Sequence, residues 1–177
     1  ATDISAITFD PDVDSIRLNG QSVTLNVQQA GLNIFSEGGS YAIRDTAQNI
    51  SASTEAVLGA AGSVSVTTEA TVSEAVVLSN FAKDVQYNIT DSAGKFAAGN
   101  ALNGAVNITT TGTSTVAEAK LIQEATNSGT NTLAAIADTA TAIAGSNNAV
   151  LASAKSITAT TFATVSEGVK IGSYAST

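Results

Sequence analysis

Acidic residues are the first candidates for chemistry in this chain, and they fall into two sets. The first set is Asp10, Asp12 and Asp14, which alternate around Pro11. Alternate carboxylates are typical of the start of a calcium-binding loop. That loop type also needs a glycine at its sixth position, which is missing here, and Gln21 stands where its bidentate glutamate would be. The segment is therefore a candidate calcium site, with a solvated turn as the simpler interpretation.

The second acidic set recurs along the chain. The aspartates are Asp45, Asp91 and Asp138, each followed by Thr-Ala or Ser-Ala, and each followed five positions later by an apolar residue (Ile50, Phe96, Ile143). An aspartate at the start of a helix accepts hydrogen bonds from free backbone amides, so we expect three N-caps. The alternative is a carboxylate ladder that binds calcium between repeats. Calcium takes about 6–8 oxygen ligands, so such a ladder would need further donors.

Threonine and glutamate three residues apart form another recurring pattern. It occurs as Thr71 with Glu74, Thr115 with Glu118 and Thr164 with Glu167. In a capping box, the threonine hydroxyl and the glutamate carboxylate each accept a hydrogen bond from a free amide at the start of a helix. We expect these six residues to be structural caps.

The residue types that catalysis uses most often are absent. The chain has no cysteine and no histidine, which removes thiol nucleophiles, thiolate metal sites and the usual general base. No Gly-x-Ser-x-Gly elbow or phosphate-binding loop occurs. We therefore expect no catalytic residues and no enzyme activity, and calcium is the one cofactor that the sequence leaves open.

Two alternating half-repeats position these residues. Each combines a short β-branched strand, a turn and a helical return of the chain. The predicted register places Leu18, Ile43, Val64, Ile89, Ile108, Ile136 and Ile157 at inward strand positions. Tyr41 and Tyr87 are expected to point inward beside Ile43 and Ile89.

This pattern predicts an α/β solenoid of about seven coils of ~23 residues, with short parallel strands stacked and short helices returning across them. Residues 1–17 lie outside the register. We expect them to form an N-terminal cap or edge strand, because Ile4, Ile7 and Phe9 resemble a strand that Pro11 ends. The solenoid then takes residues 18–177 as three and a half double-coil repeats, at 18–63, 64–107, 108–156 and 157–177.

Composition narrows the choice of partners. The chain has 177 residues and a formal net charge of -8, with only seven lysines and arginines. These cations are scattered, which argues against nucleic acid, and no apolar run approaches the ~20 residues of a membrane span. No signal peptide is recognisable at the start. We expect that a leader was removed, that this is a piece of a longer chain, or that export uses another signal.

The motifs Tyr-x-Ile-x-Asp-Thr/Ser-Ala (Tyr41–Ala47, Tyr87–Ala93) and Ala-Thr-Val-x-Glu-Ala (Ala70–Ala75) resemble a known repeat type. It is the Ala/Thr-rich repeat of large secreted bacterial surface-layer or adhesin-like proteins. The resemblance covers residues 18–174 and implies an extracellular or cell-surface location in bacteria.

We therefore expect a structural or adhesive repeat segment of an extracellular bacterial surface protein. Its partners would be itself or neighbouring repeats of a longer chain, with end-to-end assembly into a filament or lattice as a variant of this hypothesis. The alternative is a carbohydrate-binding or carbohydrate-active solenoid module with a polysaccharide partner. Exposed aromatic residues in a line would favour that alternative, whereas Tyr41 and Tyr87 are expected inside.

Two further expectations concern surfaces. Threonines on the strands, such as Thr109–Thr111, resemble an ice-binding array, but the row they form is interrupted. At the C-terminal end, the last coil is expected to expose Ile157, Ile171 and Tyr174 with an unpaired strand edge, unless Gly172–Thr177 forms a cap.

Overall fold

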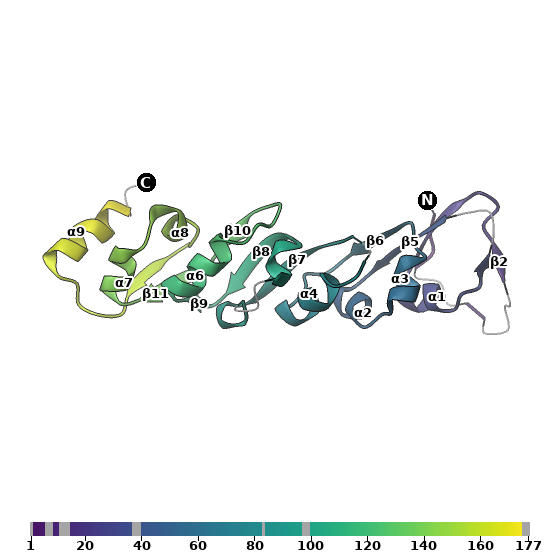
Figure 1. Cartoon of the computed structure of the whole chain (residues 1–177), viewed down its shortest axis with the longest axis horizontal. Helices are drawn as coiled ribbons and strands as arrows, with labels where there is room; N and C mark the ends of the chain where they lie inside the picture. The colour runs from purple at the N-terminus through teal and green to yellow at the C-terminus, as the bar shows by residue number, and fades with distance from the viewer. Residues whose placement is uncertain are drawn as a thin grey trace. The chain divides into compact units, whose positions relative to one another are not determined.

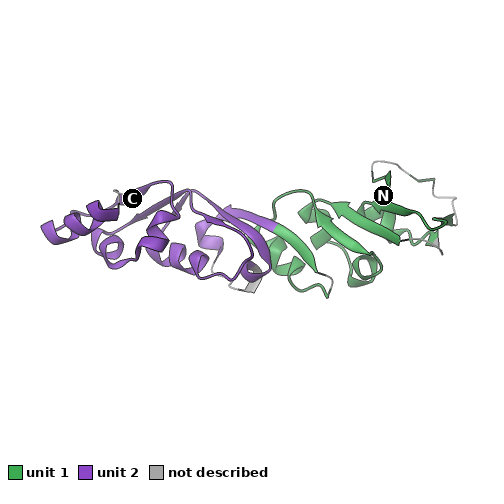
Figure 2. Ribbon diagram, turned by 90° about the horizontal axis from the view of Figure 1, so that it is seen from above, with its two compact units in different colours: residues 1–87 green, residues 88–177 purple. Residues whose placement is uncertain are grey.

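The computed structural model describes residues 2–5, 9–10, 15–36, 40–82, 84–96 and 100–174. The chain divides into two compact units, residues 1–87 and 88–177, which Figure 2 colours green and purple. In both units short strands alternate along the chain with short helices (Figure 1). The predicted mixed α/β class, with parallel strands and returning helices, is confirmed.

Seven strands form one parallel sheet in the order β1-β3-β5-β6-β7-β8-β10. Their bounds are β1 Thr2–Asp3, β3 Ser22–Leu25, β5 Ser40–Asp45, β6 Ser63–Val66, β7 Val85–Ser92, β8 Ala105–Thr111 and β10 Asn131–Thr132. Parallel neighbours need a connection that crosses back over the sheet. The helices supply most of these connections. Strand β1 pairs with β3 at Thr2–Asp3, before the residues expected to form the N-terminal edge strand; Ile4 and Phe9 are not in a strand, and Ile7 lies outside the described residues.

The remaining strands form two smaller sheets. Strands β9 (Thr113–Ser114), β11 (Ala135–Asp138) and β12 (Ile157–Ala159) form a sheet of order β12-β11-β9. Strands β2 (Ile16–Arg17) and β4 (Phe35–Ser36) pair with each other. Gly112, with φ 72°, separates β8 from β9. Glycine adopts this left-handed conformation without the cost that a Cβ atom adds, so the strand breaks there.

The helices are short. They are α1 Val27–Gly31, α2 Ala47–Ser51, α3 Glu55–Gly59, α4 Val72–Leu78, the 3₁₀ helix η1 Ala93–Lys95, α5 Asn100–Asn103, α6 Val116–Gln123, α7 Ala140–Gly145, α8 Asn148–Ala152 and α9 Val165–Tyr174. Helix α2 packs against α4, α6 against α8, and α7 against α9 (Figure 1). None of the helices in the described part of the chain has both the length and the apolar character that crossing a membrane requires.

The core is aliphatic, and its pattern follows strand alternation. In β7, Val85, Tyr87 and Ile89 are buried, while Gln86 and Asn88 between them are exposed. Successive side chains of a strand point to opposite faces, so this eight-residue strand presents one apolar face.

The predicted register is correct at some pairs and wrong at others. Ile43 lies opposite Val64, and Ile136 lies opposite Ile157, as predicted. However, Val64 lies opposite Val85 rather than Ile89, and Ile136 lies opposite Ser114 rather than Ile108. Both shifts are by an even number of residues, which keeps each side chain on its predicted face. Alternation alone therefore could not detect them.

The first predicted strand position is also wrong. Leu25, rather than Leu18, lies opposite Ile43. Leu18 is buried but precedes a tight turn in which Asn19 and Gly20 both have positive φ, and the Gln21 amide donates to the Leu18 carbonyl at 2.8 Å. The Asn-Gly pair favours such a turn, which delays the strand until Ser22.

Candidate functional site

The three predicted Thr–Glu pairs all bond reciprocally at helix starts. At α4 the Thr71 amide donates to the Glu74 carboxylate at 2.8 Å, and the Glu74 amide donates to the Thr71 hydroxyl at 3.3 Å. The same two bonds join Thr115 to Glu118 at α6, and Thr164 to Glu167 at α9. Each pair satisfies two backbone amides that a helix start otherwise leaves free.

A fourth box begins α1 and was missed in the sequence. There the Gln29 amide donates to the Asn26 side chain at 2.8 Å, and the Asn26 amide donates to the Gln29 side chain at 3.0 Å. Asparagine and glutamine replace threonine and glutamate with the same spacing. Since Asn is a good N-cap and Gln a known partner in the box, the signal was available at Asn26-Val27-Gln28-Gln29.

The recurring aspartates accept amides from two different parts of the chain. One oxygen of Asp45 accepts from the Thr46 amide at 2.8 Å, and the other accepts from the Val27 amide at 2.9 Å. Asp138 does the same with the Thr139 amide at 2.7 Å and the Val116 amide at 3.0 Å. Val27 and Val116 are the first residues of α1 and α6. Each aspartate therefore serves the helix that precedes its own strand.

The predicted N-cap position of the aspartates is consequently one residue off. The N-caps of α2 and α7 are Thr46 and Thr139, whose hydroxyls accept from the Asn49 and Ala142 amides. Asp91 likewise precedes the cap Ser92 and accepts from the Ser92 amide at 2.7 Å. A carboxylate with two oxygens can accept from two directions at once, which allows the aspartate to link neighbouring strand–helix segments.

Threonine hydroxyls perform the complementary task. The first amide of α2, at Ala47, donates to the Thr68 hydroxyl at 3.0 Å, and the first amide of α7, at Ala140, donates to the Thr161 hydroxyl at 3.0 Å. Both threonines lie three residues before a capping-box threonine. The corresponding position before Thr115 is Gly112, which has no hydroxyl. The related helical segment is only the three-residue η1, whose N-cap Ser92 makes no capping hydrogen bond with its side chain.

The row of strand threonines at Thr109–Thr111 is also not a free surface array. Thr110 is buried, and its hydroxyl accepts from the Ala134 amide at 3.1 Å. Like Thr68 and Thr161, it is engaged in linking segments of the chain.

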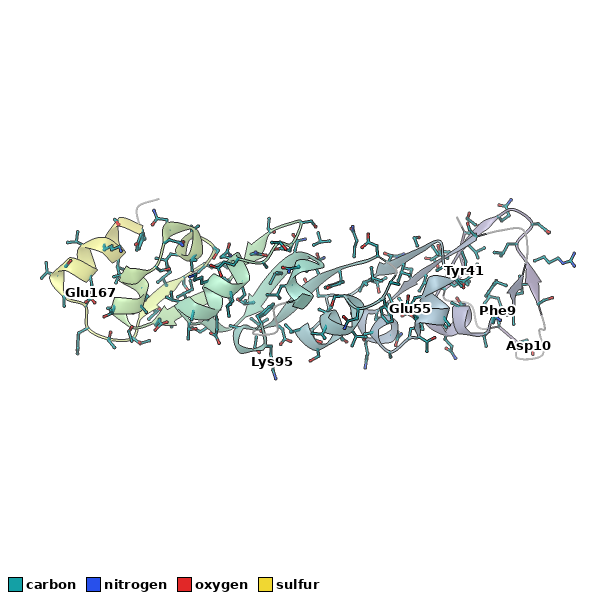
Figure 3. All side chains as sticks on the ribbon, viewed as in Figure 1. Phe9, Asp10, Tyr41, Glu55, Lys95 and Glu167 are labelled. Atoms are coloured by element: carbon teal, nitrogen blue, oxygen red, sulfur yellow. The ribbon has the colours of Figure 1, made fainter. Side chains whose placement is uncertain are left out.

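The candidate calcium segment lies mostly outside the described residues. Asp12 and Asp14 belong to the undescribed part, and only Asp10 of the three, labelled in Figure 3, can be placed, where it is exposed. Elsewhere, in the parts of the chain that the structure describes, no three histidine, cysteine, aspartate or glutamate residues gather in a group that could hold a metal ion. The calcium hypothesis for Asp10, Asp12 and Asp14 stays a prediction.

The tyrosines are engaged with the interior. Tyr87 is buried, and Tyr41 is half-buried with its ring centroid 6.2 Å from that of Phe35. Phe35 also meets Phe9 edge-on at 5.5 Å; Phe9 and Tyr41 are labelled in Figure 3. Burial raises the pKa of both Tyr41 and Tyr87 above the usual value. Tyr174 is half-buried and donates to the Ser146 carbonyl at 3.1 Å.

Two exposed carboxylates have lowered pKa values. The Thr141 hydroxyl, followed by the Thr164 amide and hydroxyl, lowers the pKa of Glu167 by donating to its carboxylate (Figure 3 labels Glu167 on α9). Hydrogen bonds from Ser5, together with Arg44, lower the pKa of Asp3. These partners stabilise the charged forms and are structural contacts rather than parts of a reactive group.

The largest exposed apolar side chains cluster on the last strand and helix. We call β12, α9 and the segment between them the C-terminal face. On it Phe162, Val165 and Val169 are 104%, 86% and 71% exposed, Ile157 is 37% exposed, and no residue of α9 is buried. Ile157, Leu151, Lys155 and Tyr174 also line a hollow of about 550 Å³. The predicted exposure is thus found at Ile157, while Ile171 and Tyr174 are half-buried.

These features form no constellation for catalysis among the described residues: the carboxylates described above bind backbone amides and hydroxyls at segment boundaries. What the arrangement does chemically is to fix neighbouring strand–helix segments to each other. The chain matches no protein-family model, no curated protein and no solved structure.

Proposed function

We propose that this chain is a structural or adhesive repeat segment of an extracellular bacterial surface protein, folded as an α/β solenoid of about seven coils of ~23 residues. The observation that carries the proposal is the linkage of successive segments by Asp45, Asp138, Thr68 and Thr161, each of which accepts the first amide of a neighbouring helix. Repeated links of this kind suit a rod that transmits force or spaces other domains.

The chemistry of the side chains supports the same proposal. The sequence has no cysteine and no histidine, and its net charge is -8. A repeat whose recurring carboxylates are engaged in backbone caps leaves little for a reaction, and a net charge far from zero keeps such a segment soluble.

The experiment is to raise antibodies against the 177-residue chain and to label intact and lysed cells of the organism that produces it. We expect labelling of intact cells, and removal of the labelled polypeptide by protease added outside the cell. Labelling only after lysis would contradict the extracellular assignment. An immunoblot of the lysed cells with the same antibodies would also report the length of the parent polypeptide.

The carbohydrate alternative has less support. Sugar-binding surfaces commonly stack aromatic rings on the ligand, whereas Tyr87 is buried and Tyr41 packs on Phe35. An open hollow beside β6 and β7 is polar, with Ser63, Ser65, Asp84 and Gln86 in its lining. Binding of the chain to a glycan array, lost on Gln86→Ala, would favour the alternative.

A further inference from the structure

The C-terminal face exposes positions that are covered at the corresponding place in α4. Thr71-Val72-Ser73-Glu74 begins α4, and Thr164-Val165-Ser166-Glu167 begins α9. Val72 is 4% exposed, whereas Val165 is 86% exposed. By contrast, Val76 of α4 and its counterpart Val169 of α9 are both exposed, at 38% and 71%. The loss of cover between α4 and α9 is therefore larger at Val165 than at Val169.

The same face has an open strand edge. The Ile136 amide donates to the Ser156 carbonyl at 2.9 Å, and the Thr160 amide donates to the Asp138 carbonyl at 2.8 Å. Because peptide groups alternate sides along a parallel strand, the amides and carbonyls of Ile157 and Ala159 point away from β11. In the sheet β12-β11-β9, β12 is at the edge. Its free side is the one on which a following strand would lie.

The N-terminal strand has the complementary free edge. Among the residues that the structure describes, strand β1 pairs with the later strand β3 alone, and the Ile4 amide donates to the Thr24 carbonyl at 3.0 Å. The Asp3 carbonyl, which shares that peptide group, therefore points away from β3. This free side is the one on which a preceding strand would lie, so β12 and β1 can pair in parallel without reversing either.

The first amide of α9 also lacks the acceptor that its counterparts have. The Val27 amide of α1 and the Val116 amide of α6 each donate to an aspartate of the following strand. No such bond to the Val165 amide occurs among the residues that the structure describes. A strand added beside β12 would occupy the place of the strands that carry Asp45 and Asp138.

The charges of the two ends are opposite in sign. Residues 1–17 contain four aspartates and one arginine, while residues 154–177 contain two lysines and one glutamate. In a chain of net charge -8, the C-terminal segment has a small positive net charge, and it attracts an acidic N-terminal segment more than a copy of itself.

From these observations we propose that a second copy of this chain docks on the C-terminal face through the free edge of its β1, so that copies associate head to tail. This inference rests on the proposed structural function, and it names a second copy of the chain as the partner of the C-terminal face. A head-to-tail contact uses two different surfaces. A dimer therefore still has one free C-terminal face and one free β1 edge, and it extends into open chains unless it closes a ring.

The test is sedimentation velocity of the 177-residue chain from low micromolar to submillimolar concentration. We expect dimers, trimers and longer species that grow with concentration. Val165→Glu should weaken association at least about tenfold, because it places a charge where a valine would be buried. Val169→Glu adds the same charge to the same helix at a position whose α4 counterpart, Val76, is still 38% exposed, so it should weaken association much less.

A mixing experiment tests the direction of the contact. Ala159→Pro removes an outward amide from β12, and Asp3→Pro removes one from β1; proline is tolerated at such an edge but prevents pairing across it. Each variant alone should be monomeric. Their mixture should form a one-to-one dimer that does not grow, with circular dichroism confirming that both variants are folded.

Three results would overturn the proposal: a strictly monomeric original chain, equal effects of the two glutamate variants, or a mixture of proline variants that stays monomeric. None of these results bears on the cell-labelling experiment, so the proposed extracellular function and the head-to-tail contact can fail separately.

Discussion

Helices α4 and α9 begin with the same four residues and differ in how far their side chains are buried. Both start with Thr-Val-Ser-Glu and both form the reciprocal Thr–Glu bonds. In α4, Val72, Ala75 and Leu78 are buried; in α9 no residue is. Strand β6, which leads to α4, has a partner on each side, whereas β12, which leads to α9, pairs with β11 alone within the described part of the chain.

This difference separates two kinds of stabilisation. The cap is local: it forms wherever the four residues occur, since all its donors and acceptors lie within one turn. Burial is non-local, because an adjacent strand–helix segment must supply the covering atoms. A segment such as α9 can therefore be a regular helix while contributing little apolar burial.

The largest effect is expected from a charge inside the covered strand. Ile136 is fully buried, and its ladder partner Ile157 is 37% exposed. Ile136→Asp should destabilise the chain by about 4 kcal/mol or more, because it buries an unpaired charge, while Ile157→Asp should cost about 1 kcal/mol or less. Urea unfolding monitored by circular dichroism measures both. Equal losses would show that β12 is covered as fully as β11.

A smaller effect is expected at Asp138. Its two oxygens accept from the Thr139 and Val116 amides, whereas asparagine offers only one acceptor oxygen. Asp138→Asn should therefore cost about 1–2 kcal/mol, close to the loss for Asp138→Ala. An ordinary N-cap would tolerate the asparagine, so a neutral result would show that the bond to Val116 contributes nothing. Glu124→Gln, at an exposed ion pair with Lys120, is the control and should be neutral.

The two capping boxes provide a smaller and more specific contrast. Thr71→Ala at α4 should lower global stability by about 1 kcal/mol, because α4 is packed on buried residues. Thr164→Ala removes the same bonds from α9, which has no buried residue. We expect its main effect to be faster amide exchange within α9, with little change in the unfolding midpoint. If Thr164→Ala lowered the midpoint as much as Thr71→Ala, α9 would be coupled to the core.

The smallest effect concerns pH. The Thr141 hydroxyl and Thr164 lower the pKa of Glu167 in the folded chain, so the charged carboxylate is favoured by folding. Its contribution is fully present above the ordinary glutamate pKa and is lost as pH falls through the lowered value. Amide exchange in α9, corrected for intrinsic rates, should therefore accelerate on acidification. Glu167→Gln should remove that pH dependence, and an unchanged profile in this variant would contradict the assignment.

Much of the local structure could be predicted from the sequence, and the longer-range pairings could not. The Thr–Glu boxes and the buried face of β7 follow from spacings of three and two residues. The pairing of Val64 with Val85 instead of Ile89 could not be predicted, because a shift of four residues leaves the same face buried. The turn at Asn19-Gly20, which moved the first strand from Leu18 to Ser22–Leu25, had a recognisable Asn-Gly signal that the register prediction did not use.

The sequence by itself determined where helices begin, because a capping bond joins residues that are three apart and needs no other part of the chain. Only the tertiary structure decided which helix each aspartate serves. Asp45 binds the Val27 amide 18 residues earlier, and Asp138 binds the Val116 amide 22 residues earlier. It also decided that Val72 is buried while Val165 is exposed. Those outcomes depend on which strand lies alongside, and the register of that strand is a property of the folded sheet, not of the four residues that start the helix.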